Sequence, residues 1–113
     1  MSPIMKQKLR QEDASKDLSE EIEKAIEAPD LSTFQAKVRQ PNFDPNMTLD
    51  NGYSLLSYAI IKENLHVVRF LVVKGARVDR EDAKKTTPLQ YASSCNNTDI
   101  IEAVRYAGIY QTR

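Results

Sequence analysis

Two stretches of this chain repeat each other at a fixed distance, and that distance constrains the fold more than any single residue does. Residues 52–59 read GYSLLSYA and residues 85–92 read KTTPLQYA. Tyr58 and Tyr91 therefore stand 33 positions apart. Sequence periods of roughly 20–50 residues are typical of stacked units that bury their apolar faces against one another. We expect a repeat fold in which neighbouring units complete a shared core.

The central unit is predicted to be a pair of helices that follows a tight turn. Gly52 comes directly after an asparagine, and this dipeptide favours turns because both residues tolerate positive φ. Ser54 can cap a helix that runs from residue 55 to about residue 62. Asn64 starts a second helix, which Gly75 ends as a left-handed cap.

The third unit repeats this plan. Thr87 is a predicted N-cap, Pro88 takes the first helical position, and Gln90 stands where a capping-box partner belongs. Thr98 or Asp99 then opens the last helix.

The N-terminal part divides into a tail and a weaker helix pair. Residues 1–16 are polar and of mixed charge, and we expect a flexible tail. Residues 17–28 have a helical apolar stripe. Asp30 is a candidate cap for a second helix over residues 31–39.

These motifs match a known family. The strings GYSLLSYA and KTTPLQYA resemble the Gly-x-Thr-Pro-Leu-His-x-Ala signature of ankyrin repeats, and residues 67–79 resemble the second helix and closing Gly-Ala-x-Val-Asn of such a unit. The resemblance implies an all-α fold, an ankyrin-type repeat solenoid of about three stacked helix-turn-helix units. We expect one ankyrin-repeat domain over residues 17–113, with approximate units 17–46, 47–79 and 80–113.

Four positions depart from the family pattern. Leu55 replaces the usual proline, while Ser57 and Gln90 replace the histidine that ties neighbouring turns together. Lys85 stands at the position of the turn glycine. We expect these departures to lower stability without changing the fold.

The composition restricts the class of function. Sixteen basic and sixteen acidic residues cancel, so no overall field attracts nucleic acid or an anionic membrane. No stretch approaches the roughly 20 apolar residues of a membrane span. The single cysteine cannot form an internal disulfide and fits a reducing compartment. We expect a soluble, cytoplasmic protein, with a nuclear or host-cell-delivered location left open.

Residues that could carry chemistry are scarce. His66 is the only histidine, and it is predicted to lie on the solvent side of its helix with no set of metal ligands around it. Cys95 is interpreted as a small, partly buried thiol or, failing that, as a contact residue in a groove. The three glycines form no phosphate-binding pattern. We therefore predict a protein that is not an enzyme and that uses no metal and no cofactor.

A surface for a partner remains. In the family that this chain resembles, partners contact the turn tips and the exposed positions of each first helix. Tyr53 and Ile61 add a physical argument, because they are apolar residues at positions expected to face away from the stacked core. The resemblance implies these partner-binding residues: Asp50, Asn51, Tyr53, Ile61 and Lys62 in one unit, and Ala83, Lys84, Thr86, Ser94 and Cys95 in the next.

The last helix raises a separate question, because a terminal repeat is expected to present a polar outer face. Tyr106, Ile109 and Tyr110 instead leave that face fairly apolar. Either Ile109 and Tyr110 fold back over the core, or the face meets another chain, or the chain is part of a longer array.

Three hypotheses for function follow. The first is a non-enzymatic protein–protein interaction module that binds a protein partner of unknown identity through its concave turn and first-helix face. The second is an assembly or scaffold subunit that self-associates through the apolar C-terminal helix. The third is a secreted bacterial effector that binds a host protein, a role that some ankyrin-type proteins play.

Overall fold

The computed structural model describes residues 19–28, 30–39, 41 and 43–111. The predicted flexible tail, residues 1–16, lies outside the described residues. Residues 19–27 are helical and are followed by five labelled helices: α2 (Leu31–Val38), α3 (Leu55–Ile61), α4 (Leu65–Val73), α5 (Pro88–Ser94) and α6 (Thr98–Gln111). Within these ranges the only extended pairing is an isolated bridge between Thr48 and Ser54. The expected all-α fold is confirmed.

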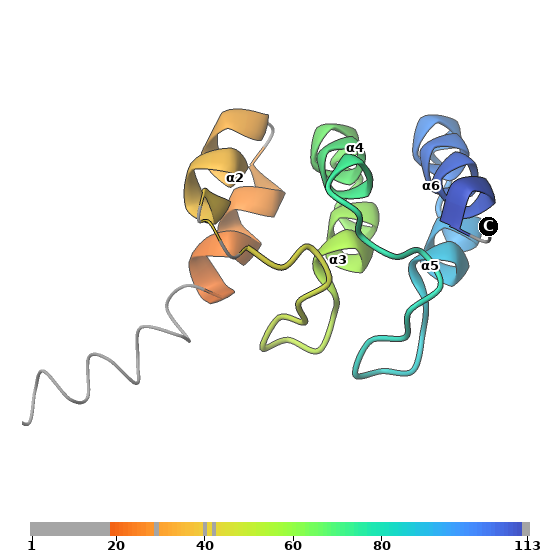
Figure 1. The fold of residues 1–113 in the computed structure, drawn as a ribbon, viewed down its shortest axis with the longest axis horizontal. Helices are drawn as coiled ribbons and strands as arrows, with labels where there is room; N and C mark the ends of the chain where they lie inside the picture. The colour runs from red at the N-terminus through yellow and green to blue at the C-terminus, as the bar shows by residue number, and fades with distance from the viewer. Residues whose placement is uncertain (1–18, 29, 40, 42, 112–113) are drawn as a thin grey trace, which may run out of the picture.

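The helices stand in three adjacent pairs (Figure 1). α3 packs against α4 and α5, while α6 packs against α4 and α5, and α2 contacts α4. The loops that precede α3 and α5 project from the same side of the stack (Figure 1). This arrangement is the repeat solenoid that the 33-residue period predicts.

One continuous core runs through the three pairs, because each pair covers the apolar side chains of the next. Ile100 and Val104 of α6 are buried, whereas Ile101 is only half-buried. The largest fully buried side chains in the described part of the chain come from every pair: Ile22, Ile26, Phe34, Leu55, Leu56, Ile60, Val67, Val68, Leu71, Val78, Ile100 and Val104.

The caps predicted for the second and third units are confirmed. The Ser54 hydroxyl accepts a hydrogen bond from the Ser57 amide at 3.1 Å. Thr87 and Gln90 form the reciprocal capping box, in which each side chain accepts from the other residue's amide. Asn64 caps α4, and its side-chain amide also donates to the Ile26 carbonyl of the preceding unit at 2.8 Å. Asn64 therefore caps its own helix and also joins two neighbouring units.

Two predicted details of the helix ends are wrong. Asp30 stands at the N-cap position of α2, but its side chain makes no capping hydrogen bond, and α2 ends at Val38 instead of residue 39. By contrast, α6 begins at Thr98 as predicted, and Asn97 just before it accepts a hydrogen bond from the Ile100 amide. A cap depends on the side-chain rotamer, which the residue type alone does not determine.

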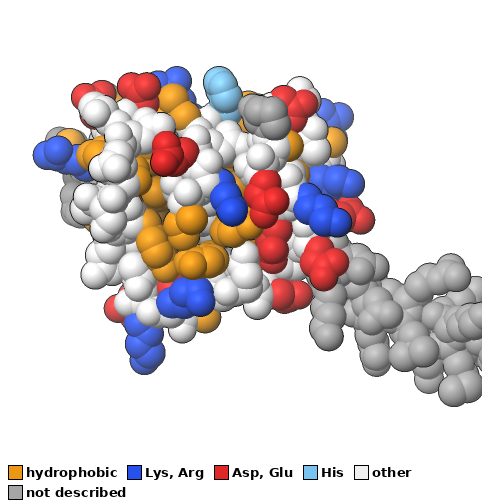
Figure 2. Space-filling view, turned by 180° about the vertical axis from the view of Figure 1, so that it is seen from behind, with side chains coloured by type: hydrophobic (Ala, Val, Ile, Leu, Met, Phe, Trp, Pro, Cys, Tyr) orange, Lys and Arg blue, Asp and Glu red, His pale blue; other side chains and the backbone are white. Residues whose placement is uncertain are grey.

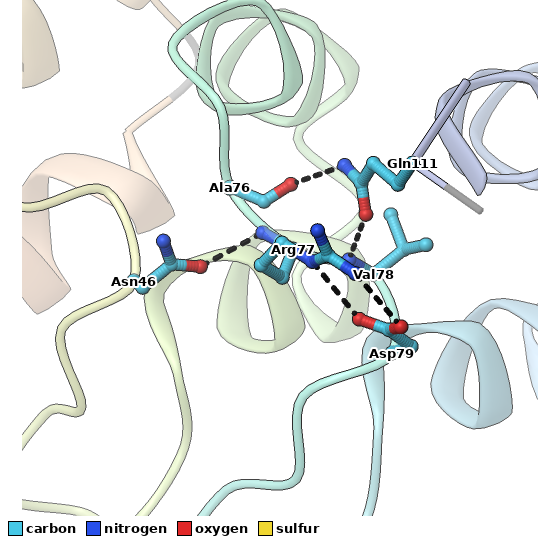
Figure 3. A network of polar contacts seen from close by, with 6 residues as sticks. All are labelled: Asn46, Ala76, Arg77, Val78, Asp79 and Gln111. Atoms are coloured by element: carbon cyan, nitrogen blue, oxygen red, sulfur yellow. Dashed lines mark hydrogen bonds and ion pairs between the residues drawn. The ribbon is translucent and has the colours of Figure 1, made fainter. Parts of the chain in front are cut away.

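The loop that follows α4 is tied to the units on both sides of it (Figure 3). The Asn46 side chain accepts a hydrogen bond from the Arg77 amide at 2.8 Å. On the other side, Gln111 accepts from the Val78 amide at 2.9 Å and donates to the Ala76 carbonyl at 2.7 Å. Two side chains, each more than 30 positions away in sequence, thus satisfy three backbone groups of this loop.

Candidate functional site

A row of three tyrosines connects the turn before α3 to the two inner helices. Tyr53, from the turn, lies between Tyr58 of α3 and Tyr91 of α5. The ring centroids are 5.8 Å apart for Tyr53 and Tyr58 and 5.7 Å apart for Tyr53 and Tyr91. These distances are typical of attractive aromatic pairs. The tyrosine row therefore spans the junction between two repeat units.

Two of the three hydroxyl groups are held by carboxylates. The Tyr58 hydroxyl donates to Glu27 at 2.5 Å, and the Tyr91 hydroxyl donates to Asp82 at 2.9 Å. Burial, together with the bond to Glu27, raises the pKa of Tyr58 above its ordinary value. Burial and the neighbouring Asp82 likewise raise the pKa of Tyr91. Both hydroxyls are therefore neutral donors at physiological pH, and the rings keep a fixed orientation.

Asp82 also organises the turn that carries the second half of the site. Its carboxylate accepts hydrogen bonds from the Lys84 amide at 2.9 Å and from the Thr86 amide at 3.1 Å. The side chain is buried, so these bonds and the one from Tyr91 take the place of water. One carboxylate thus fixes both the turn and the end of the tyrosine row.

Two lysines lie over rings of the row. The Lys84 ammonium is 5.0 Å from the Tyr53 centroid, and the Lys62 ammonium is 5.5 Å from the Tyr58 centroid. Both lysines are exposed, so each contact is a weak cation–π interaction. The aromatic surface therefore has a positively charged border.

Tyr53 differs from its expected position. It is half-buried and packs against the core, although the sequence predicted that it would face away from it. The rings of Tyr58 and Tyr91 lie on either side of it, and this contact favours the inward position. Ile61, by contrast, is 39% exposed, as predicted. Ile61 is therefore the better free apolar contact on this face.

The other predicted binding residues fall into two groups. The turn tips meet directly, because the Ala83 amide donates to the Gly52 carbonyl at 3.0 Å. Ser94 is the last residue of α5 and Cys95 follows it; they stand one repeat after Ile61 and Lys62 at the end of α3. Within this second group, the Cys95 amide donates to the backbone carbonyl of Tyr91 at 3.1 Å, a bond at the end of α5. Exposed members of the predicted set are Asp50, Lys62, Ala83, Lys84 and Ser94, and half-buried members are Asn51, Thr86 and Cys95.

Sequence reasoning did not place Tyr58, Tyr91 or Asp82 in the site. The repeat itself contained an indication for the tyrosines, because both occupy the same position of the 33-residue unit. No comparable pattern marks Asp82, whose role depends on the conformation of the turn.

One face of the molecule combines apolar and charged areas (Figure 2). Seen from behind the view of Figure 1, hydrophobic side chains gather in a patch, with Lys or Arg side chains below it and Asp or Glu side chains to its right. An apolar area with a charged border is typical of protein-binding surfaces.

The candidates for catalysis remain apart. His66 is exposed on α4, and Cys95 is half-buried, with its Sγ 3.8 Å from the Asn97 carbonyl oxygen. In the part of the chain that the structure describes, no three or more His, Cys, Asp or Glu side chains come together as possible metal ligands. The same part contains no helix of the length and apolarity that a membrane crossing requires.

Comparisons with known proteins agree with the geometry. A family model described as ankyrin repeats (three copies) matches residues 22–112. The RelA-associated inhibitor of Mus musculus is 37% identical over 75 residues, which is 66% of this chain. The chain spans only 9% of the length of that relative. No solved structure matches the chain.

Proposed function

Because the chain belongs to the ankyrin-repeat family, we propose that it binds a protein partner along the face formed by the turn tips, α3 and α5. The proposed role is recognition without catalysis. The observation that supports this face best is the tyrosine row, Tyr58–Tyr53–Tyr91, which joins two units on it.

The row is suited to recognition because its side chains are already ordered. Tyr53 has a ring on each side, and Tyr58 and Tyr91 are anchored through their hydroxyls. Fixed aromatic side chains lose little conformational entropy when a partner binds, and tyrosine is enriched at energetic centres of interfaces. The half-buried rings then act as a floor, and the exposed residues around them make the first contacts.

The border of the row gives the proposed face its selectivity. Lys62 and Lys84 are exposed at two points along the row, and Ile61 adds exposed apolar area at the end of α3. A partner with apolar side chains and nearby carboxylates would match this arrangement in both shape and charge.

The name of the murine relative suggests a first partner to test. That protein is called a RelA-associated inhibitor, and we propose RelA as a candidate partner of this chain. Titration calorimetry with purified RelA would compare the wild-type chain with the variant Ile61→Glu/Lys84→Glu. We expect binding by the wild type and a loss of affinity of about tenfold or more in the variant.

Arg105→Glu serves as the control for charge reversal elsewhere on the surface, because Arg105 is exposed on α6, away from the proposed face. It should bind like the wild type. Equal affinity of all three proteins for RelA would show that the face is wrong. No binding by any of them would remove RelA as the candidate partner.

Self-association is a second candidate function, and the end of α6 favours it. Tyr106, Ile109 and Tyr110 are 62%, 61% and 59% exposed, so the alternative in which Ile109 and Tyr110 fold back over the core is wrong. Exposed apolar side chains of this size often mark interfaces. Sedimentation velocity over a wide concentration range would detect a dimer that Tyr106→Glu abolishes. A monomer at the highest concentration would exclude this function.

The third hypothesis, a secreted bacterial effector that binds a host protein, stays a prediction.

A further inference from the structure

A hollow lies on the outer side of the stack, away from the tyrosine row. It has a volume of about 640 Å³ and is formed where the end of α2 meets the end of α4. None of its lining residues belongs to α3 or α5: Gln35, Val38, Arg39, Pro41, Phe43, Phe70 and Lys74. The hollow is therefore a separate surface from the proposed partner face.

The floor of the hollow is apolar and held in place. Phe70 packs edge-on against the buried ring of Phe34, with centroids 5.7 Å apart. Phe43 is half-buried against the core, and Val38 is buried. An apolar side chain of a partner could therefore lose its water here without displacing part of the core.

The rim of the hollow is positively charged. Arg39 and Lys74 are exposed, and the described residues that line the hollow include no carboxylate. The Lys74 ammonium lies 5.6 Å from the Phe70 centroid. The two ion pairs found among the described residues are Lys37–Glu21 and Arg77–Asp79, so neither rim cation has a carboxylate partner there.

This positive rim is a local property. The whole chain has no net charge. The positive charge at the rim is therefore a local excess, which acidic residues elsewhere in the chain balance. An occupant of complementary charge must therefore supply its own carboxylates.

We propose that this outer hollow binds an acidic peptide segment of a partner protein, in which a branched or aromatic apolar side chain is flanked by Asp or Glu. The apolar side chain lies on Phe43 and Phe70, and the flanking carboxylates pair with Arg39 and Lys74. Recognition needs both parts, because exposed ion pairs alone contribute little in water. The outer helices would then recognise one partner segment while the tyrosine row stays free for another.

Selection from a random library of peptides of about twelve residues tests the proposal without knowledge of the natural partner. Peptides that bind the wild-type chain are enriched, and those that also bind the double variant Arg39→Glu/Lys74→Glu are removed. The expected survivors have an excess of Asp and Glu around an aromatic or branched apolar residue. Their affinity for the double variant should fall about tenfold or more, since reversed charges repel the flanking carboxylates.

Lys24→Glu/Arg69→Glu is the matched control, because both residues are exposed cations outside the hollow and the change in net charge is the same. It should keep wild-type affinity for the selected peptides, and so should Ile61→Glu/Lys84→Glu on the tyrosine face. Thermal unfolding of each variant checks that the fold is intact. In NMR titrations the selected peptides should shift the amides of Phe43, Phe70 and Lys74 and leave that of Tyr53 in place.

Several results would overturn the proposal. One is a selection that returns no peptide dependent on Arg39 and Lys74, or returns peptides without an acidic excess. Another is equal binding of a plain oligoglutamate, which would reduce the hollow to unspecific attraction of anions. Amide shifts confined to the tyrosine row would also place the peptides elsewhere, and this outcome would leave the proposed function of that row unaffected.

Discussion

Lys85 has the same left-handed backbone as Gly52, the residue that stands 33 positions before it. Their φ angles are +61° and +95°, and both lie at the tip of the turn that precedes an inner helix. Glycine adopts such a φ freely, whereas a residue with a Cβ is strained there. The turn therefore keeps its left-handed backbone at Lys85, although lysine replaces the glycine of the family pattern there. This agrees with the expectation that the departures from the pattern leave the fold unchanged.

The strain at Lys85 predicts a stabilising substitution. Lys85→Gly should raise the free energy of unfolding by about 0.5–1 kcal/mol, because relief of the left-handed strain exceeds the extra freedom of glycine in the unfolded chain. Urea denaturation measures the change. Lys84→Gly is the control, since it removes the same charge where φ is not left-handed. It should lower stability, and a gain of equal size in both variants would contradict this explanation.

The position of Tyr53 predicts a stability effect that separates it from Ile61. Tyr53→Ala should lower the free energy of unfolding by about 1–2 kcal/mol, because a half-buried ring loses its contacts with Tyr58 and Tyr91. Ile61→Ala should change it by no more than about 0.5 kcal/mol, since this side chain is 39% exposed. Chemical denaturation of both variants is the measurement. Equal losses would mean that Tyr53 does not support the stack.

The raised pKa of Tyr58 predicts a loss of stability at alkaline pH. In the unfolded chain this hydroxyl gives up its proton near pH 10, whereas burial and Glu27 keep it protonated in the folded protein. Its contribution is therefore fully present below about pH 10 and is lost as the pH rises further. Tyr58→Phe should show a shallower decline in urea midpoint between about pH 9.5 and 11.5.

Tyr53→Phe provides the control for this experiment, because it keeps the hydrogen bond between Tyr58 and Glu27. It should retain the wild-type dependence on pH. If Tyr58→Phe declined as steeply as the wild type, the Tyr58 hydroxyl would not be the group responsible.

The two side chains that hold the loop after α4 predict separate local effects. Gln111→Ala should speed hydrogen exchange at the Val78 amide and lower the free energy of unfolding by about 1–2 kcal/mol, because two backbone groups lose their partner. Asn46→Ala should instead speed exchange at the Arg77 amide. Each variant is the control for the other. Equal acceleration of both amides in both variants would show that the loop opens as one piece.

The helix boundaries could largely be predicted because their determinants are local. Thr87 and Gln90 form their capping box within four residues, and Ser54 caps α3 in the same way. Asp30 has an equally suitable side chain, yet it makes no capping bond. Residue type indicates where a helix begins, but it does not determine whether the side chain turns toward the backbone.

The candidate site could be predicted less well, because its main contacts join residues far apart in sequence. Glu27 and Tyr58 are separated by 31 positions, and Tyr53 meets a ring from the following unit. The sequence around Asp82 does not reveal its role, because the Lys84 amide, the Thr86 amide and the Tyr91 hydroxyl reach its carboxylate only when the turn has formed. All of the predicted contact residues, Tyr53 included, remain predictions of binding.

The architecture follows from the amino-acid sequence, because a 33-residue period of apolar positions, caps and turn residues is satisfied by a stack of helix pairs. The direction of Tyr53, the carboxylates that hold Tyr58 and Tyr91, and the place of the outer hollow become visible in the folded chain alone. Periodicity describes the helices of one unit, whereas these features depend on the conformation of the turns and on how closely the side chains of neighbouring pairs pack.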